Sequence, residues 1–210
     1  SIDKGKKAKI AKIYFLGDKK LREKRLRDVI TSQESKFWKF LSRNVYLNNA
    51  RVELDKRLLK NYYRNKGYYE ATVTSSNVEY LEGEGFILTY SIDAGDRYRF
   101  KKIFANVSES LDKNAFLSLE TEFNKLVGKY YSQEKLNSVL EKIDKLAERK
   151  ELQFINHNVL ETLDDNEVEV KINIFEGKKV IVERINIVGN SVTNDSVIRG
   201  EMIVDEGDPF

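Results

Sequence analysis

The sequence has no cysteine, one histidine and one proline among its 210 residues, and its apolar runs are short. Without cysteine the fold uses neither disulfides nor thiolate ligands. His157 alone is too little for a transition-metal site, and nothing in the sequence gives it a catalytic partner. No run approaches the roughly 20 apolar residues of a membrane-spanning helix. We therefore expect no catalytic, cofactor-binding or metal-binding residues, and a protein that is not an enzyme.

The sequence also has no marked excess of positive charge. The 37 Lys and Arg residues nearly balance the 34 Asp and Glu residues, and the two signs are mixed along the chain. Such a chain is a poor electrostatic match to a nucleic-acid backbone. The glycine-rich phosphate-binding patterns and the G-x-x-G loop of KH-type RNA modules are missing too. We expect no nucleic-acid partner, and a repeat that binds nucleic acid through Lys-rich helices and tyrosines is a distant alternative.

What the sequence does contain is a repeat. The order strand, two amphipathic helices, strand and strand occurs twice and then begins a third time. The opening strands contain Ile13, Ile103 and Ile185, so one unit is about 80 to 90 residues long. This pattern predicts an α+β chain of tandem modules, placed at 7–95, 96–178 and, incomplete, 179–210.

The first unit carries two helix patterns. Leu26, Val29 and Ile30 have helical spacing, and a second helix is predicted from about Arg51 to Asn65, ended by Gly67. The apolar arc expected on that second helix consists of Leu54, Leu58, Leu59, Tyr62 and Tyr63.

The second unit repeats the pattern with clearer helical stripes. Asp112 and Ser132 are the expected N-caps of its two helices. The stripes are Phe116, Leu119, Phe123 and Leu126, then Leu136, Val139, Leu140, Ile143, Leu146 and Ala147. Each unit closes with an alternating strand whose apolar side should lie under the helices, namely Phe86, Leu88, Tyr90 and Ile92, then Val168, Val170, Ile172 and Ile174. Short connections predict that adjacent units pack directly.

The most specific motif joins the second helix and second strand of the first unit. The run Tyr63-Arg64-Asn65-Lys66-Gly67-Tyr68-Tyr69-Glu70-Ala71-Thr72-Val73 resembles the Y-x-x-x-G-Y-x-x-A-x-V signature of POTRA (polypeptide-transport-associated) modules. Val188-Gly189-Asn190 resembles the opening of such a module. The middle unit departs from the pattern at Ala105-Asn106-Val107 and Lys150-Glu151-Leu152, so its junctions need not follow the family's angles.

The resemblance is to the BamA type of outer-membrane assembly protein, at its third, fourth and opening fifth modules. It implies β-α-α-β-β modules, each a three-stranded mixed sheet with two helices on one face. It also implies a periplasmic arm at the outer membrane, attached to a membrane β-barrel that this sequence does not include. The implied partners are unfolded outer-membrane proteins and accessory assembly lipoproteins. POTRA arms of related translocation and secretion proteins are the alternative, because fold alone does not settle function.

The sequence and the resemblance indicate two kinds of binding region, one for clients and one for docking partners. An open sheet edge can accept an extended client through backbone hydrogen bonds, and the polar second strand of the first unit is the expected client edge, at Thr72, Val73, Thr74, Ser75, Ser76 and Asn77. For partner docking, the resemblance singles out Glu201 with Met202 on a short helix of the last unit. Trp38, in an aromatic loop with Phe37 and Phe40, either caps the core or is a second docking site.

Overall fold

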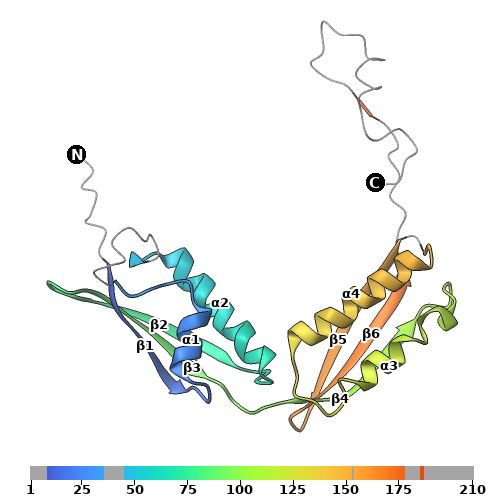
Figure 1. The fold of residues 1–210 in the computed structure, drawn as a ribbon, viewed down its shortest axis with the longest axis horizontal. Helices are drawn as coiled ribbons and strands as arrows, with labels where there is room; N and C mark the ends of the chain where they lie inside the picture. Colours follow the sequence, from blue (N-terminus) through green and yellow to red (C-terminus); the bar gives the residue numbers. More distant parts are fainter. Residues whose placement is uncertain (1–8, 36–44, 153, 178–184, 187–210) are drawn as a thin grey trace, which may run out of the picture.

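The computed structural model describes residues 9–35, 45–152, 154–177 and 185–186, without the side chains of residues 74–76. Within this part the chain forms two α+β units that follow one another (Figure 1). We call them the first and the second module. Apart from residues 185–186, the expected third module lies outside the described residues, and the exact module boundaries stay a prediction.

The first module has five elements in the expected order. They are β1 (Ile10–Asp18), α1 (Glu23–Val29), α2 (Asn49–Asn65), β2 (Thr72–Leu81) and β3 (Gly85–Asp93). The sheet order is β1-β3-β2, with β3 parallel to β1 and antiparallel to β2. The predicted mixed three-stranded sheet is therefore confirmed, and β1 and β2 are its two edges.

The second module repeats this topology. Its elements are β4 (Arg99–Val107), the 3₁₀-helix η3 (Lys113–Phe116), α3 (Leu119–Asn124), α4 (Gln133–Arg149), β5 (Ile155–Asp164) and β6 (Glu167–Glu176). The sheet order is β4-β6-β5, again parallel on one side and antiparallel on the other. The first helix of this module, expected as one stripe, is split into η3 and α3.

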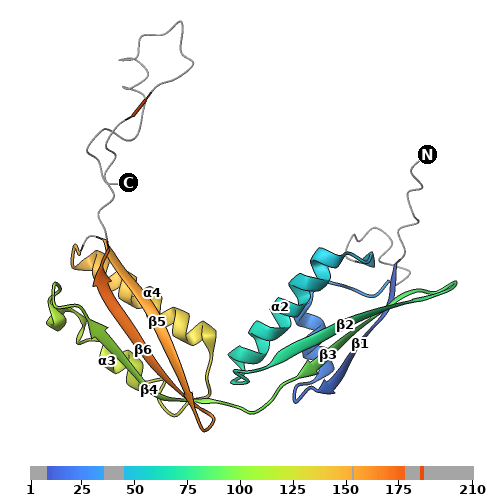
Figure 2. The same cartoon turned by 180° about the vertical axis from the view of Figure 1, so that it is seen from behind.

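The helices cover one face of each sheet, as Figures 1 and 2 show from opposite sides. The alternating strands β3 and β6 lie at the centre and bury every second side chain toward the helices. The buried side chains are Leu88, Tyr90 and Ile92 on β3, and Val168, Val170, Ile172 and Ile174 on β6. Phe86, at the start of β3, is only half-buried.

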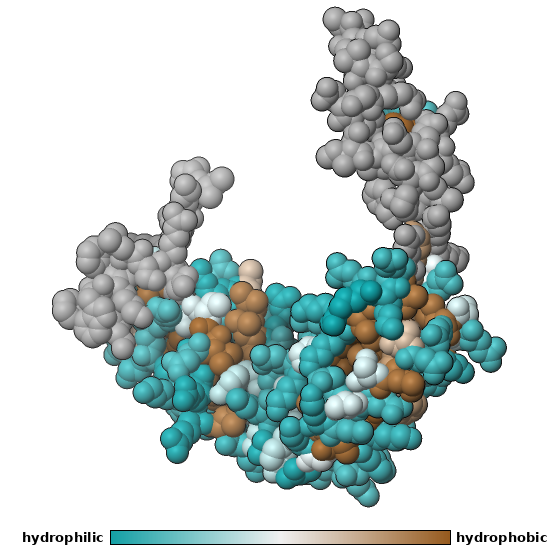
Figure 3. Space-filling model, turned by 45° about the vertical axis from the view of Figure 1, so that its right-hand side comes forward, coloured by the Kyte–Doolittle hydropathy of each residue, from teal (hydrophilic) through white to brown (hydrophobic). Residues whose placement is uncertain are grey.

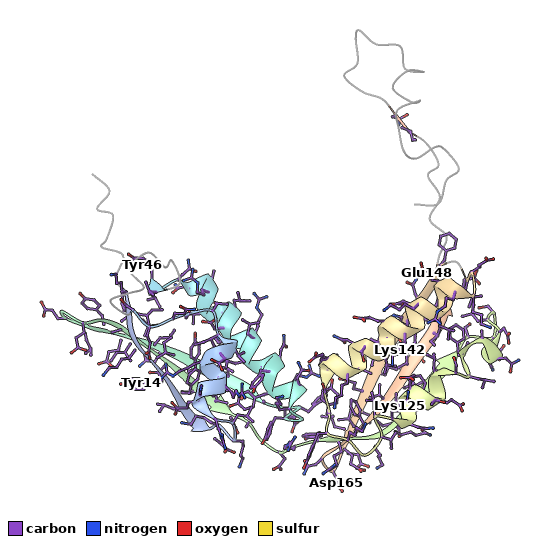
Figure 4. The ribbon with its side chains drawn as sticks, in the orientation of Figure 1. Tyr14, Tyr46, Lys125, Lys142, Glu148 and Asp165 are labelled. Carbon is purple, nitrogen blue, oxygen red and sulfur yellow. The ribbon has the colours of Figure 1, made fainter. Side chains whose placement is uncertain are left out.

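Helix ends also follow the sequence. Gly67 has a left-handed φ of 96° directly after α2, as a terminating glycine should. Asp112 and Ser132 accept backbone hydrogen bonds at the starts of η3 and α4, which confirms both expected caps. On the surface, Glu122 of α3 pairs with Lys125 and with Lys142 of α4, and these contacts lower its pKa to about 2. Figure 4 labels the two lysines, Lys125 beside α3 and Lys142 on α4.

One expected core position on α2 is wrong. Leu54 is 37% exposed, whereas the adjacent Asp55 is fully buried. The Asp55 carboxylate accepts hydrogen bonds from the backbone N–H groups of Thr31 and Ser32 at 2.6 and 3.2 Å and from the Tyr90 hydroxyl at 2.8 Å. A buried carboxylate is tolerated when its oxygens are satisfied in this way. Asp55 therefore fixes the segment after α1 to the module core.

Candidate functional site: an open strand edge and the joint between modules

The two edges of the first sheet differ in how well their backbone groups are covered. The N–H of Ile13 on β1 donates to the Glu34 carboxylate at 3.0 Å, and its carbonyl accepts from Arg27. The N–H of Ser35 reaches the Ile10 carbonyl at 2.8 Å. The segment that Asp55 holds thus lies along β1 and blocks its outer side.

Strand β2 has no such cover. Its backbone pairs with β3, and in the described part of the chain no other strand or loop hydrogen-bonds to its outer side. The pairing shifts between Val73 and Ser75, which leaves Thr74 out of the paired register, as in a β-bulge. The expected client residues Thr72 to Asn77 therefore lie together at the start of an open edge strand, and Thr72 and Asn77 are exposed.

The second sheet has a partly covered edge at β4. Residues 128–131 pair with the start of this strand through the bonds Phe100 N–H to Lys129 O and Gly128 N–H to Phe100 O, at 2.9 and 2.8 Å. Further along, Ile103 to Val107 border a groove of about 390 Å³ beside η3 and α3. Apolar surface occurs on both modules in the face drawn in Figure 3, with hydrophilic surface between.

The signature run Tyr63 to Val73 lies where the two modules meet. Tyr63 is fully buried in the first module and its hydroxyl donates to the Lys19 carbonyl at 2.6 Å. Gly67 accepts a backbone bond from Tyr98 of the second module at 2.8 Å, and a Cβ at Gly67 would lie 3.2 Å from Tyr130. Glycine therefore meets both a conformational and a close-packing need here.

Glu161 of β5 is the centre of the contact between modules. Its carboxylate accepts from the hydroxyls of Tyr69 and Tyr131 at 2.6 and 2.7 Å, and it pairs with Arg64 at 3.3 Å. The Arg64 guanidinium also stacks on the Tyr69 ring at 4.4 Å. Burial, with the hydrogen bond to Glu161, raises the pKa of the Tyr69 phenol to about 12, and burial raises that of Tyr131 further.

A helix cap also crosses the joint. The Asn65 side chain, at the end of α2, accepts from the backbone N–H of Glu134 in the first turn of α4 at 2.9 Å. Direct packing of adjacent modules, expected from the short connection, is thereby confirmed.

Family membership was tested by comparison with known proteins. Residues 8–95 match the POTRA family model, described as a surface antigen variable number repeat. BamA assembly factors from Neisseria meningitidis and Nitratidesulfovibrio vulgaris align with the whole chain at 24% and 25% identity. The first module therefore belongs to the POTRA family.

The POTRA fold extends over both described modules. A fragment of Haemophilus influenzae BamA, POTRA3-5, superposes with a TM-score of 0.67 at 20% identity, covering 97% of this chain and 80% of that one. The POTRA1-2 pair of the periplasmic domain of Omp85 from Anabaena gives a TM-score of 0.52 at 12% identity, covering 81% and 96%.

The chain spans only about a quarter of the length of the curated relatives it matches. It covers 26% of the Neisseria protein and 27% of the Nitratidesulfovibrio protein, both named outer membrane protein assembly factors. The Anabaena POTRA1-2 pair is itself described as part of a periplasmic domain. No helix in the described residues is long and apolar enough to cross a bilayer.

The remaining residues considered in the sequence are three proposed docking residues and His157. Trp38, Glu201 and Met202 lie outside the described residues, so their docking role stays a prediction. His157 of β5 hydrogen-bonds to Asp144 of α4 at 2.9 Å and so links a strand to its covering helix. Within the described ranges, no group of three or more His, Asp or Glu side chains could hold a metal ion.

The sequence interpretation missed the residues that build the POTRA joint. Glu161 looks like any polar residue of an alternating strand, and Asn65 like any exposed helix residue. The one available signal was the density of tyrosines around the signature, because a buried tyrosine needs a partner for its hydroxyl.

Proposed function

We propose that this chain is part of a periplasmic scaffold for outer-membrane β-barrel assembly. In this proposal, unfolded outer-membrane proteins add an extended segment to the outer side of β2. The relatives' names as outer membrane protein assembly factors support the pathway. The observation that carries the binding mode is the contrast between the covered edge of β1 and the open edge of β2.

Strand addition suits clients of many sequences. The bonds that hold the client run between backbone groups, which every residue except proline can provide. Unfolded β-barrel segments are already inclined to extended conformations. An open edge can also pair with unwanted chains, so proteins usually cover their sheet edges. The first module covers β1 but leaves β2 open, and this difference supports a binding role for β2.

The accessory-lipoprotein partners are a second part of the proposal. They rest on the family resemblance at Glu201 and Met202 and on the aromatic loop at Trp38. The assignment of the modules as third, fourth and fifth is supported by the likeness to the POTRA3-5 fragment.

Proline at Thr74 tests the β2 edge. Because Thr74 lies outside the paired register with β3, Thr74→Pro should preserve the sheet while disturbing the outer side of the strand. We expect at least about a fivefold loss of affinity for a peptide from an outer-membrane β-strand, roughly one backbone hydrogen bond or more. Fluorescence anisotropy with a labelled peptide measures this.

Thr74→Ala is the matched control, since it removes the side chain and keeps the backbone N–H. It should bind like the unchanged chain. Circular dichroism and thermal unfolding would verify that both variants fold. A folded Thr74→Pro variant that binds the peptide at full affinity would show that β2 is not the client edge.

A further inference from the structure

A hollow of about 440 Å³ opens at the joint between the two modules. Its lining comes from the end of α2 and the turn after it, the connection to β4 and the first residue of β4, the loop before α4, and α4 itself. The lining residues are Asn65, Lys66, Arg97, Arg99, Gly128, Lys129, Tyr130 and Lys135. Five of these eight are cations and none is an acid.

The described residues provide no ion-pair partner for these five cations. In the part that the structure describes, none of them forms an ion pair with a carboxylate. By contrast, Lys101, two residues after Arg99, pairs with Asp164 and Glu167 at 2.6 and 3.5 Å. Asp96 and Glu134 precede two of the lining cations in the chain, yet neither is ion-paired with them. Clustered like charges repel, and a bound anion would relieve that repulsion.

The two arginines are held in place before any ligand arrives. The Arg97 guanidinium stacks on the Tyr130 ring at 3.3 Å, and its Nε donates to the Lys66 carbonyl at 2.9 Å. The Arg99 guanidinium lies 4.0 Å from the centre of the same ring and donates to the Gly128 carbonyl at 2.7 Å. A guanidinium has five N–H groups, so most of the donors on each arginine are left for a ligand.

We propose that this hollow binds a phosphate group, carried either by a free phosphate ion or by an anionic lipid headgroup. Arginine forks match the oxygens of phosphate in paired hydrogen bonds, and the lysines add charge without demanding one geometry. A phosphate dianion also balances more of the five charges than a single carboxylate can. Because both modules line the hollow, a bound phosphate bridges them and stiffens the joint.

The test uses the whole chain with Lys129→Gln and Lys135→Gln combined. Neither lysine side chain makes a hydrogen bond or ion pair with a described residue, so the double variant should fold normally. The matched control combines Arg57→Gln and Lys60→Gln, which removes the same charge from exposed positions of α2 that do not line the hollow. Calorimetric titration with inorganic phosphate gives the affinity, and cosedimentation with phosphatidylglycerol or phosphatidylcholine vesicles separates the two sources.

We expect the phosphate association constant to fall at least about tenfold in the lysine pair and to change little in the control pair. Binding of phosphate together with retention on phosphatidylglycerol vesicles alone supports a lipid headgroup. Binding of phosphate without vesicle retention supports a soluble phosphate ligand. No binding of either probe, or equal losses in both variant pairs, would overturn the proposal.

Discussion

At the scale of single residues, the joint depends on carboxylates that lie close to tyrosines. Glu161 joins Tyr69, Tyr131 and Arg64 within 3.3 Å, and Glu70 accepts from the Tyr98 hydroxyl at 2.6 Å nearby. These partly buried groups hydrogen-bond to one another, so the loss of one leaves the others without a hydrogen-bond partner.

Replacing Glu161 tests this directly. Glu161→Gln keeps the shape but removes the charge that Arg64 and both tyrosines face. We expect the chain to lose about 1–3 kcal/mol of unfolding free energy in a urea titration, because hydrogen bonds to a charged group are lost. Tyrosinate absorbance should also show Tyr69 ionising at lower pH than its pKa of about 12.

The pH direction follows from that raised pKa. A phenol with a folded pKa above the unfolded value near 10 stabilises the fold below about pH 10, and this stabilisation is lost as the pH rises toward 12. In Glu161→Gln the alkaline loss should shrink. Glu141→Gln, at an exposed position of α4, is the control and should match the unchanged chain. Equal stability and an unmoved Tyr69 titration in Glu161→Gln would refute this role.

For helices and strands, the sequence predicted the strands and the helix caps better than the contacts between residues that are distant in sequence. Ser132 could be recognised as the cap of α4 because capping residues stand at a fixed spacing from the helix they begin. The strand alternation likewise identified the buried residues of β3 and β6. The burial of Asp55 was not predicted, because its carboxylate is satisfied by partners such as Tyr90 that are distant in sequence.

Asn65 is the element-scale case that can be tested. It belongs to α2 but satisfies a backbone N–H in the first turn of α4. Asn65→Ala should cost about 0.5–2 kcal/mol, as loss of a helix cap does. The amide of Glu134 should then exchange with solvent several-fold faster in hydrogen-exchange NMR. Asn61→Ala, at an exposed position one turn earlier, should leave that amide unchanged. Unaltered exchange in Asn65→Ala would mean that the modules are not coupled through this cap.

At the scale of the whole molecule, the two modules share a topology but use their surfaces differently. The repeat and the signature motif predicted the family and the sheet type, and the short connection predicted direct packing of the modules. They could not predict the joint, because Arg64, Asn65 and Glu161 come together only when two folded modules meet. The cationic hollow was not predicted for a related reason. The total charge is nearly balanced, and the five cations come from two elements and three connections that lie far apart in the sequence.

The three roles inferred for the chain lie at separate places in the structure. In the function proposed above, β2 of the first module offers backbone groups to an extended client, while β1 is covered by the segment that Asp55 anchors. At the joint, Glu161 holds the modules together and the neighbouring hollow gathers positive charge. Client binding should therefore survive changes at the hollow.

If extended clients pair with the outer side of β2, backbone NMR should detect the contact on that strand. Amide shifts of the chain would be followed during titration with an unlabelled peptide from an outer-membrane β-strand. We predict that the largest changes fall on β2, Thr72 to Leu81, with protection of its outward N–H groups from exchange. Changes confined to β5 or to the groove beside β4, with β2 unaltered, would contradict the account.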